Sequence, residues 1–583
     1  MSFEEKLSYY LTKSKSLSNG FEKDIRVSFL SSFTTNGIEE CFKVKCSERK
    51  INCTTYLGGY NQYNQEILNT KSQLYQFNPD ITFLILDTRS ILGDLWYFSH
   101  LLDENQRKDF ISQKFEELKN LIEIFVKNSK SKLVISNFTI PSKSSYGISE
   151  TKSKFGLQVM INKLNENLQN FISTLDSVFL FDMNGFITRY GENNIFNPKQ
   201  FFFGDIKIAL DFIPYLSNEL MGYVIATLGL SKRCIVLDLD NTLWGGIIGE
   251  DGFDGIKLGI GPPGNAFVEF QKCLLGLFHR GILLAINSKN NFDDAIEVIE
   301  KHPDMILKKE HFTSMKINWN DKVSNIKEIS EEMNFGLDNF VFIDDDPINR
   351  EFMKSSLPQV LTVDLPKDPS KYTQILEEMI EFNVLEITDE DKKRGLMYSQ
   401  QKERKNFEKS SSNLQDFLKD MELKVTIKKA DKFTIPRISQ LILKTNQFNL
   451  TTKRYQLEEI QKFSEDNNMI VECVQIEDKF GDNGITGAFI VQKSNSNEWI
   501  LDTFLLSCRV MGREIEKSIL SYIIEIAKKN NVKKLKAEFI TTKKNKPIEN
   551  FLPDCGFKKD GNFWEISLNE SFAKPDFIKI GKT

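Results

Sequence analysis

Two aspartates separated by one residue follow a short hydrophobic run near the middle of the chain. The run 234–237 (Cys-Ile-Val-Leu) is followed by Asp238-Leu239-Asp240-Asn241-Thr242. Where a buried strand ends and the backbone turns, both carboxylates can face one site, so one can act as a nucleophile and the other can transfer a proton. The Asp-x-Asp pattern also occurs in solvated turns and calcium loops, and the pair alone leaves both interpretations open.

Three further polar signals follow in the next part of the chain. Ser288 comes after the hydrophobic run 282–286, Lys322 comes next, and Asp344-Asp345-Asp346-Pro347 follows the run 340–343. Alternating hydrophobic runs and helical patterns indicate a parallel α/β sheet, in which the carboxyl ends of the strands meet at one edge. In this order, the four signals resemble the haloacid dehalogenase-like (HAD) phosphohydrolase superfamily.

The resemblance implies a mechanism with four catalytic side chains. Asp238 would attack a phosphorus atom and form an aspartyl-phosphate, and Asp240 would protonate the leaving group and later activate water. Ser288 would hydrogen-bond the transferred phosphoryl oxygens, and Lys322 would offset the negative charge that develops on them.

The same resemblance implies a magnesium ion. Its ligands would be Asp238, the backbone carbonyl of Asp240 and the acidic pair, with Asp344 favoured and Asp345 as the second candidate. Asp346 could also be a ligand, but a turn residue before Pro347 is the favoured interpretation. The chain has only four histidines, none at a ligand spacing, which agrees with a carboxylate site for a hard cation.

The spacing of the motifs leaves no room for a large cap domain. Ser288 lies 50 residues after Asp238, and Asp344 lies 22 residues after Lys322. The site should therefore be open, which suits a phosphate on a macromolecule or a site closed by another domain or a partner.

Longer phrases resemble one subfamily of the HAD proteins, the FkbH-like proteins of subfamily IIIC. The phrases are Asp-Leu-Asp-Asn-Thr-Leu-Trp-Gly-Gly from 238, Asn-Ser-Lys-Asn-Asn from 287, residues 342–351, residues 445–455 and residues 62–66. Members of this family are associated with removing phosphate from 1,3-bisphosphoglycerate and loading the glyceryl group onto the phosphopantetheine thiol of an acyl carrier protein. The resemblance therefore implies a phosphorylated small-molecule donor and an acyl carrier protein as partners.

The region before residue 231 resembles the SGNH-hydrolase-like amino-terminal domain of this family. No clear Gly-Asp-Ser nucleophile block is visible, Ser31 and Ser32 are weak substitutes, and Asn137 has no convincing histidine partner. We interpret this region as a degenerate hydrolase fold that serves interaction or covers the HAD cleft.

The carboxyl-terminal region resembles the GNAT acyltransferases. The strand-like run 500–506 leads into Cys508-Arg509-Val510-Met511-Gly512-Arg513-Glu514 and then a helical pattern to 528. Arg509 and Gly512 fit a turn whose backbone N–H groups bind a pyrophosphate at a helix start. Glu514 replaces the final small residue, so acyl-CoA binding is in doubt, whereas a carrier-borne phosphopantetheine arm could still dock. Cys508 could relay an acyl group, although a structural role is favoured.

Other cysteines and a run of lysines admit plainer interpretations. Cys234 and Cys273 lie in apolar runs and are expected to be core residues. Lysines between 528 and 546 could attract an acidic carrier protein, but a solvated face is the commoner meaning of such a run.

Composition and charge bound the remaining possibilities. The 583 residues favour several domains, and 40% hydrophobic with 27% charged residues predict folded domains. A net charge of -5 does not favour nucleic acid as a partner, and no apolar run is long enough to suggest a membrane. Eight cysteines without a CxxC pair give little support to disulfides or zinc, and the start lacks a leader pattern, so we expect a cytoplasmic protein.

The predicted fold class is α/β with three domains. They are an SGNH- or flavodoxin-like domain at 1–230, a capless Rossmann-like HAD domain at 231–385 and a GNAT-like α+β domain at 420–575, with a helical connector at 386–419. The leading functional hypothesis is a magnesium-dependent phosphohydrolase and glyceryl transferase. The alternatives are a phosphatase of a small metabolite or phosphosugar, and a GNAT-type N-acyltransferase whose HAD domain is a scaffold. Asp238→Asn would abolish activity under the first two hypotheses and leave it intact under the third.

Overall fold

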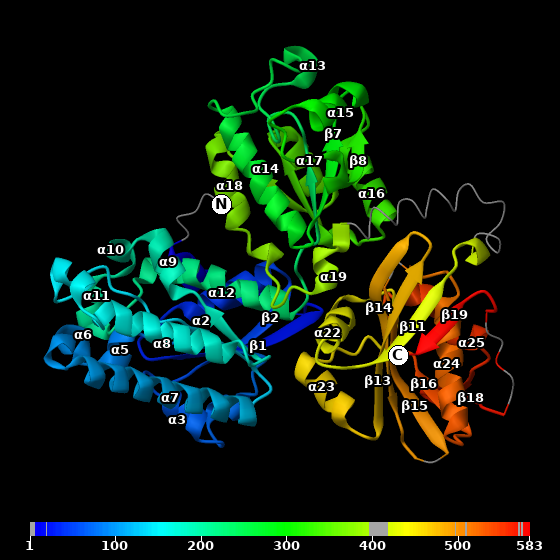
Figure 1. Ribbon diagram of the computed structural model, residues 1–583, viewed down its shortest axis with the longest axis horizontal. Coiled ribbons are helices and arrows are strands. Elements are labelled where there is room, and N and C mark those ends of the chain that lie inside the picture. The colour runs from blue at the N-terminus through cyan, green and yellow to red at the C-terminus, as the bar shows by residue number, and fades with distance from the viewer. Residues whose placement is uncertain are drawn as a thin grey trace. The chain divides into compact units, whose positions relative to one another are not determined.

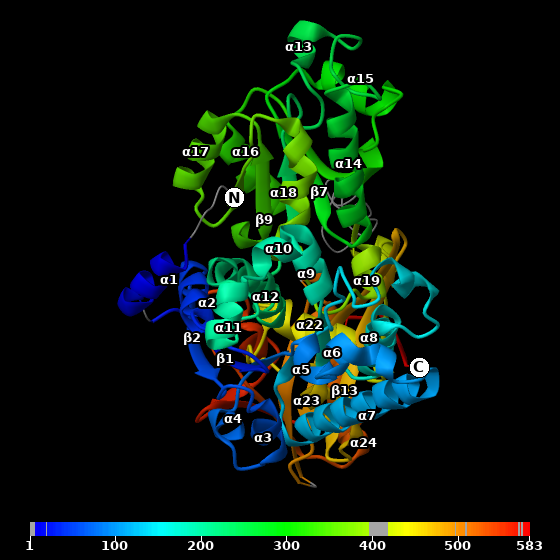
Figure 2. The ribbon, with the colours of Figure 1, turned by 90° about the vertical axis from the view of Figure 1, so that its left-hand side faces the viewer.

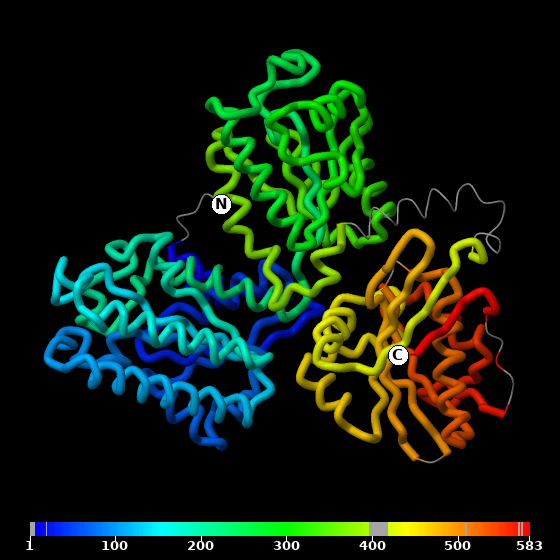
Figure 3. Tube along the Cα trace, viewed as in Figure 1, coloured from blue at the N-terminus to red at the C-terminus, as the bar shows by residue number. Residues whose placement is uncertain are grey.

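The structure is a computed structural model that describes residues 6–18, 20–395, 418–495, 497–507, 510–569, 572 and 575–582. The chain divides into two compact units, one of residues 2–224 and one that contains residues 225–583. The described residues form three sheets, two of five strands and one of nine. Their strands are the arrows of Figure 1, and Figure 3 traces the chain from its N-terminus to its C-terminus. The first two sheets are parallel and the third is mixed, so the α/β multidomain class is confirmed. Within the described ranges, no helix combines the length and apolar character needed to cross a bilayer.

The first unit is built on a parallel sheet with the strand order β2-β1-β3-β4-β5. The strands are β1 (Lys23–Ser31), β2 (Ile51–Leu57), β3 (Ile81–Ile85), β4 (Lys132–Ser136) and β5 (Val178–Phe181). The helices are α1 (Leu7–Lys13), α2 (Ile38–Glu48), α3 (Tyr63–Leu68), α4 (Gln73–Phe77), α5 (Thr88–Leu92), α6 (Leu95–Phe98), α7 (Glu104–Asn128), α8 (Leu157–Ile172), α9 (Met183–Tyr190), α10 (Glu192–Ile195), α11 (Pro198–Gly204) and α12 (Ile213–Thr227).

Both faces of this first sheet are covered by helices. On one face, leucines and isoleucines of β1, β3 and β4 pack with apolar residues of α7 and α8 in one buried cluster. On the other face, Phe29 of β1 packs against Phe42 of α2, and Phe83 of β3 packs against Tyr223 of α12. Helices on both faces explain why the strands are hydrophobic throughout rather than alternating.

The second sheet is parallel, with the strand order β10-β9-β6-β7-β8. Its strands are β6 (Cys234–Leu237), β7 (Leu283–Ser288), β8 (Phe312–Ile317), β9 (Phe340–Asp344) and β10 (Leu361–Asp364). The helices that accompany it are α13 (Ile248–Asp251), α14 (Gly264–His279), α15 (Phe292–Lys301), α16 (Lys322–Met333), α17 (Pro347–Ser356), α18 (Tyr372–Glu377) and α19 (Asp389–Lys392). Most of the expected connector, residues 396–417, lies outside the described residues.

Alternate residues of β6 enter different cores of this central domain. Ile235 and Leu237 pack with α14, α15 and α18, whereas Cys234 and Val236 pack with α16 and α17. The two sets of helices lie on opposite faces of the sheet (Figure 2). This doubly wound arrangement leaves the carboxyl edge of the strands for polar groups.

The third sheet is mixed, and its main path is β17-β18-β16-β15-β14-β13-β11-β19. Its strands are β11 (Lys424–Lys429), β12 (Phe448–Asn449), β13 (Met469–Asp478), β14 (Gly481–Gln492), β15 (Glu498–Leu506), β16 (Lys534–Glu538), β17 (Lys558–Asp560), β18 (Phe563–Ser567) and β19 (Lys579–Lys582). The helices are α22 (Ile435–Lys444), α23 (Leu457–Glu465), α24 (Ile515–Lys529) and α25 (Phe551–Asp554).

In this third sheet, α24 packs on one face, and α22 and α23 pack on the other. The neighbouring strands β15 and β16 are parallel, but they pair only over residues 498–501 and 534–537. Beyond that point β12 pairs with the end of β15, and the carbonyl of Leu450 accepts a hydrogen bond from the Ile540 N–H at 2.9 Å. The segment after α22 thus bridges the ends of the two strands.

Candidate active site of the central sheet

The structure brings the predicted catalytic residues together at the carboxyl edge of the central sheet. Asp238 follows β6, Ser288 ends β7, Asp344 ends β9, and Lys322 begins α16. The strands β9, β6 and β7 are parallel neighbours, so their ends converge on one place. Ser288, Lys322 and Asp344 are almost fully buried, and Asp238 is 7% exposed.

Lys322 is the positive centre of this site. Its Nζ lies 2.9 Å from Asp238 Oδ2 and 2.6 Å from Asp344 Oδ2. Burial lowers the pKa of Lys322, but the two carboxylates outweigh that effect and hold its pKa above the usual value. The lysine therefore remains charged and can offset negative charge on a phosphoryl group.

Three carboxylates at this edge are close enough to bind one cation. Oxygens of Asp238, Asp344 and Asp345 all lie within 4.8 Å of one another. Asp238 Oδ1 is buried and has no hydrogen-bond partner among the described residues. Burial, together with the charges of Asp238 and Asp344, raises the pKa of Asp345 to about 7. One lysine cannot neutralise three carboxylates, so the set fits a divalent cation with oxygen ligands.

The second aspartate of the motif is held by three hydrogen-bond donors. Asp240 Oδ1 accepts bonds from Trp244 Nε1 at 2.9 Å and from the Ile248 N–H at 3.1 Å. Asp240 Oδ2 accepts a bond from Asn290 Nδ2 at 3.0 Å. Burial raises the pKa of Asp240, although these donors favour its ionised form.

The loop after Asp240 positions two of these donors, Trp244 and the Ile248 N–H. Asn241 adopts a left-handed conformation with φ of 51°, and its side-chain oxygen accepts a bond from the Gly246 N–H at 2.9 Å. Gly246 has φ of 92°, which a residue with a Cβ rarely adopts. The resulting tight turn places the fully buried Trp244 against the carboxylate of Asp240.

Several site residues were not predicted from the sequence. Arg350 Nη1 donates to the carbonyls of Asp344 at 2.9 Å and Asp345 at 2.6 Å, and so fixes the acidic loop. Trp244 and Asn290, which hold Asp240, were present in the quoted phrases but had no assigned role. The signal that could have identified these two residues was their position within the phrases that resemble the FkbH-like proteins.

Asp346 caps a helix, as the turn interpretation predicts. Its Oδ1 accepts a hydrogen bond from the Ile348 N–H at 2.9 Å at the start of α17. Its own N–H donates to Asp344 Oδ1 at 2.9 Å, which orients that carboxylate.

In the first unit, the residues expected to mark a degenerate hydrolase site have structural partners. Ser31 donates to the carbonyl of Phe33, and Ser32 Oγ accepts a bond from the Asp87 N–H at 2.8 Å. Asn137 donates to Asp182 Oδ1 at 2.7 Å. Both serines are buried, and His100 is the only histidine in the sequence of this unit.

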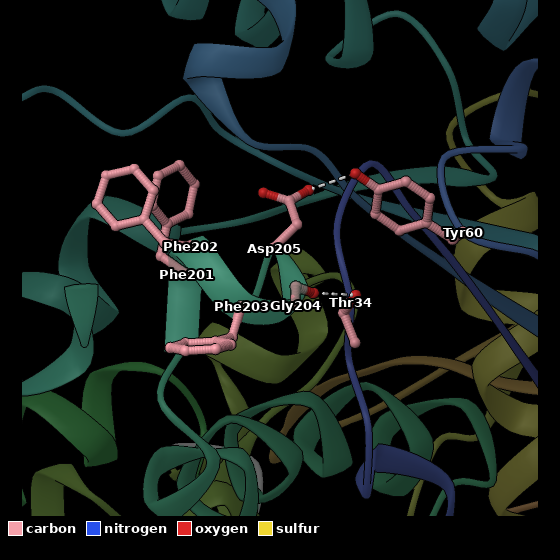
Figure 4. Close-up of a pocket in the computed structure, with 7 residues that line it drawn as sticks. All are labelled: Thr34, Tyr60, Phe201, Phe202, Phe203, Gly204 and Asp205. Carbon is pink, nitrogen blue, oxygen red and sulfur yellow. Dashed lines mark hydrogen bonds between the residues drawn. The ribbon is translucent and has the colours of Figure 1, made fainter. Parts of the chain in front are cut away.

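A cavity of about 500 Å³ lies beyond the end of β1 in this unit, and it is lined by Thr34, Tyr60, Phe201, Phe202, Phe203, Gly204 and Asp205. Tyr60 donates to Asp205 Oδ2 at 2.7 Å, and Phe203 points away from the other two phenylalanines (Figure 4). Lys207 Nζ lies 2.9 Å from Asp205 Oδ1 and 3.4 Å from Asp87 Oδ2. Asp205, the charged residue among those that line this cavity, is therefore paired with Lys207.

Beside the third sheet, the turn between β15 and α24 is partly described. Cys508 and Arg509 lie outside the described residues, while Gly512 has a positive φ of 76° and open space beside it. Glu514 stands at the start of α24 with φ of 59°, and its carboxylate pairs with Lys517 at 2.9 Å. A carboxylate at a helix start already occupies the position that favours an anion.

The two cysteines of the central domain differ in burial. Cys234 is fully buried in the core, and burial raises its pKa well above the usual value. Cys273 on α14 is half-buried, and burial raises its pKa to about 11. Both thiols therefore stay protonated at neutral pH, as expected of core residues.

Comparison with known proteins finds a family match in the first unit. Residues 26–225 match the family model of the FkbH N-terminal domain. A solved structure from Bacteroides fragilis, the N-terminal part of a protein containing a phosphatase domain complexed with Mg, matches with 28% identity and a TM-score of 0.59. The match covers 65% of this chain and 99% of that chain. A comparison with curated proteins gave no match.

Smaller structures of the GNAT class also match part of the chain. An acetyltransferase of the GNAT family from Desulfovibrio desulfuricans is 10% identical, with 25% of this chain and 99% of that chain covered and a TM-score of 0.21. A spermidine N-acetyltransferase from Vibrio cholerae is 13% identical, with 25% and 94% covered and a TM-score of 0.21.

Proposed function

We propose that the chain is an FkbH-like enzyme whose central HAD-type domain is a magnesium-dependent phosphohydrolase acting on an acyl phosphate. The observation that carries this proposal is the position of Lys322 between Asp238 and Asp344 at the carboxyl edge of the sheet. The similarity to the Bacteroides fragilis phosphatase-domain structure supports the same reading.

The side chains support a two-step reaction through the enzyme. A carboxylate oxygen of Asp238 attacks the phosphorus of the phosphate ester of 1,3-bisphosphoglycerate, the bond from phosphorus to the ester oxygen breaks, and the alcohol leaves with a proton from Asp240. Water then attacks the phosphorus of the aspartyl-phosphate and gives its proton to Asp240, releasing phosphate and restoring Asp238. Ser288 and Lys322 hold the phosphoryl oxygens during both steps.

Magnesium would be held by the cluster of Asp238, Asp344 and Asp345, with the carbonyl of Asp240 as a further ligand. The unpartnered oxygen of Asp238 and the raised pKa of Asp345 support a cation at this position. When bound, the ion supplies positive charge next to the phosphoryl oxygens.

The proposal also names a donor and an acceptor. FkbH-like proteins are associated with 1,3-bisphosphoglycerate and an acyl carrier protein, and we extend both to this chain. Under this proposal the hydrolytic steps leave the acyl phosphate of the donor intact. The phosphopantetheine thiolate of the carrier attacks the acyl carbonyl carbon, the bond from that carbon to the bridging oxygen breaks, and phosphate leaves. The FkbH N-terminal domain is what supports that extension.

The experiment is a carrier-loading assay with matched controls. The full chain is incubated with Mg²⁺, 1,3-bisphosphoglycerate and a phosphopantetheinylated carrier from the same genome, and the intact mass of the carrier is followed beside free phosphate. Asp238→Asn removes the nucleophile, and Asp293→Asn makes the same change at an exposed position on α15.

The proposal predicts a glyceryl mass gain on the carrier that is lost in Asp238→Asn and kept in Asp293→Asn. Phosphate release without a mass gain would contradict the transfer step and favour a small-molecule phosphatase. Carrier loading that persists in Asp238→Asn would contradict the role of the central domain.

A further inference from the structure

Asn290 lies between two catalytic groups and reaches both with one amide. Its Nδ2 lies 3.0 Å from Asp240 Oδ2 and 3.1 Å from Ser288 Oγ. A primary amide nitrogen carries two hydrogens, so both contacts can be hydrogen bonds at once. An ionised carboxylate can only accept, which requires the nitrogen of Asn290, rather than its oxygen, to face Asp240.

We propose that Asn290 is a positioning residue that sets the proton geometry of both Asp240 and Ser288. This inference rests on the proposed phosphohydrolase function of the same site. It adds a role for a residue whose side-chain hydrogen bonds, among the described residues, are to Asp240 and Ser288.

For Asp240, the contact decides which oxygen does the chemistry. Oδ1 already accepts two hydrogen bonds, from Trp244 Nε1 and the Ile248 N–H. Oδ2 accepts only the Asn290 contact among the described residues, so it retains capacity for a proton. Asn290 holds that working oxygen on the side of Ser288, where the phosphoryl group would bind.

For Ser288, the contact decides where the hydroxyl hydrogen points. Because Ser288 Oγ accepts a bond from Asn290, its own hydrogen is free to donate elsewhere. The serine is buried and ends β7 at the carboxyl edge of the sheet, beside Asp240. The hydroxyl is thus arranged to donate to a phosphoryl oxygen.

The neighbouring residues indicate that this orientation is local. Lys289 and Asn291 on either side are exposed, whereas Asn290 is 5% exposed. The side chain of Asn291 contacts Asp294 and Trp319 at the surface. Asn291 is therefore a matched control, because it has the same amide and does not reach the site.

The test compares leaving groups. Acetate leaves acetyl phosphate without a proton, whereas the more basic phenolate of phenyl phosphate benefits from protonation by Asp240. Wild type, Asn290→Leu and Asn291→Leu are assayed with Mg²⁺ on both compounds. Thermal unfolding midpoints and Mg²⁺ affinity are measured in parallel as readouts of the fold.

We expect Asn290→Leu to lower kcat about 100-fold on phenyl phosphate and about 10-fold on acetyl phosphate, with KM changed less than about 3-fold. Asn291→Leu should leave both rates within about 2-fold of wild type. An equal fall on both substrates, or no fall, would overturn the inference.

A second measurement separates this inference from the proposed function. If the wild type hydrolyses neither compound, the phosphohydrolase proposal fails, and crystal structures of wild type and Asn290→Leu test the positioning directly. Displacement of Asp240 Oδ2 and Ser288 Oγ in the variant would support the inference. Unchanged positions of both atoms would overturn it.

Discussion

Lys322 and Asp344 form a fully buried ion pair in which Nζ and Oδ2 lie 2.6 Å apart. The same Nζ lies 2.9 Å from Asp238, so one ammonium group serves two carboxylates. Burial and the charge of Asp238 raise the pKa of Asp344, and Lys322 opposes both effects. The ammonium group of Lys322 therefore stabilises both carboxylates, and a bound cation would add further positive charge.

Removal of this lysine should destabilise the central domain. Lys322→Met leaves two buried carboxylates without their cation, which costs about 3–5 kcal/mol in the free energy of unfolding. Thermal unfolding followed with and without Mg²⁺ measures this, and we expect Mg²⁺ to restore more stability in the variant than in the wild type. Lys327→Met, an exposed position on the same helix, should change stability by less than about 0.5 kcal/mol. Equal stability of the two variants would contradict the account.

The affinity for Mg²⁺ should increase with pH. Asp345 has a pKa of about 7 in the metal-free protein and must lose its proton to bind the cation. Below pH 7 the affinity should fall roughly tenfold per pH unit, measured by titration calorimetry between pH 6 and pH 8. A pH-independent affinity over this range would contradict the assignment of Asp345 as a ligand.

The raised pKa of Asp345 also makes the stability of the metal-free protein depend on pH. The folded pKa of Asp345 lies above its usual value, so protonation stabilises the fold. This contribution is present at low pH and is lost as the pH rises through about 7. Without Mg²⁺, the thermal stability of the central domain should fall as the pH rises from about 4, the usual pKa of an aspartate, to about 7. Mg²⁺ should oppose this loss.

Arg350 should control the affinity of the cation site without touching the cation. It holds the carbonyls of Asp344 and Asp345, and Arg350→Met frees the acidic loop. We expect Mg²⁺ affinity to fall by about 10- to 100-fold, as for other groups that orient metal ligands. Lys354, on the same helix, contacts Glu351 and Asp364 instead. Lys354→Met should therefore leave the Mg²⁺ affinity unchanged. An unaltered affinity in Arg350→Met would show that the loop is rigid without it.

The start of α24 should bind anions poorly. Glu514 places a carboxylate at that helix terminus, where a pyrophosphate would otherwise be favoured. We expect coenzyme A to leave the thermal midpoint of the wild type unchanged and to raise that of Glu514→Gly. Stabilisation of the wild type by coenzyme A would contradict this view.

The placement of the main polar residues could be predicted from the sequence because it depends on strand ends. Hydrophobic runs fix β6, β7 and β9, and the next polar residue on each must lie at the common edge. Asp238 and Asp344 follow from that rule, whereas Ser288 comes one residue after the polar Asn287 and was singled out by the resemblance to the HAD superfamily. Asp346 could also be predicted as a turn residue because a proline follows it.

Other features depend on side-chain directions that spacing does not encode. Asn290 faces inward between two exposed neighbours, and only the local backbone decides which of the three does so. Arg350 acts on backbone carbonyls, which no sequence pattern identifies. The pairing of β12 with the end of β15 joins segments that are far apart in the chain. It depends on where β15 and β16 cease to pair, which the sequence does not indicate.

The most direct test of the central claim is to identify the residue that receives the phosphoryl group. Asp240→Asn should slow hydrolysis of the intermediate, so the full chain carrying this change is incubated with Mg²⁺ and acetyl phosphate, quenched in acid and digested for peptide mass analysis. The account predicts one phosphoryl group on Asp238, absent when Asp238→Asn is added. Phosphate turnover with no phosphoryl group on Asp238, or with the group on another residue, would contradict it.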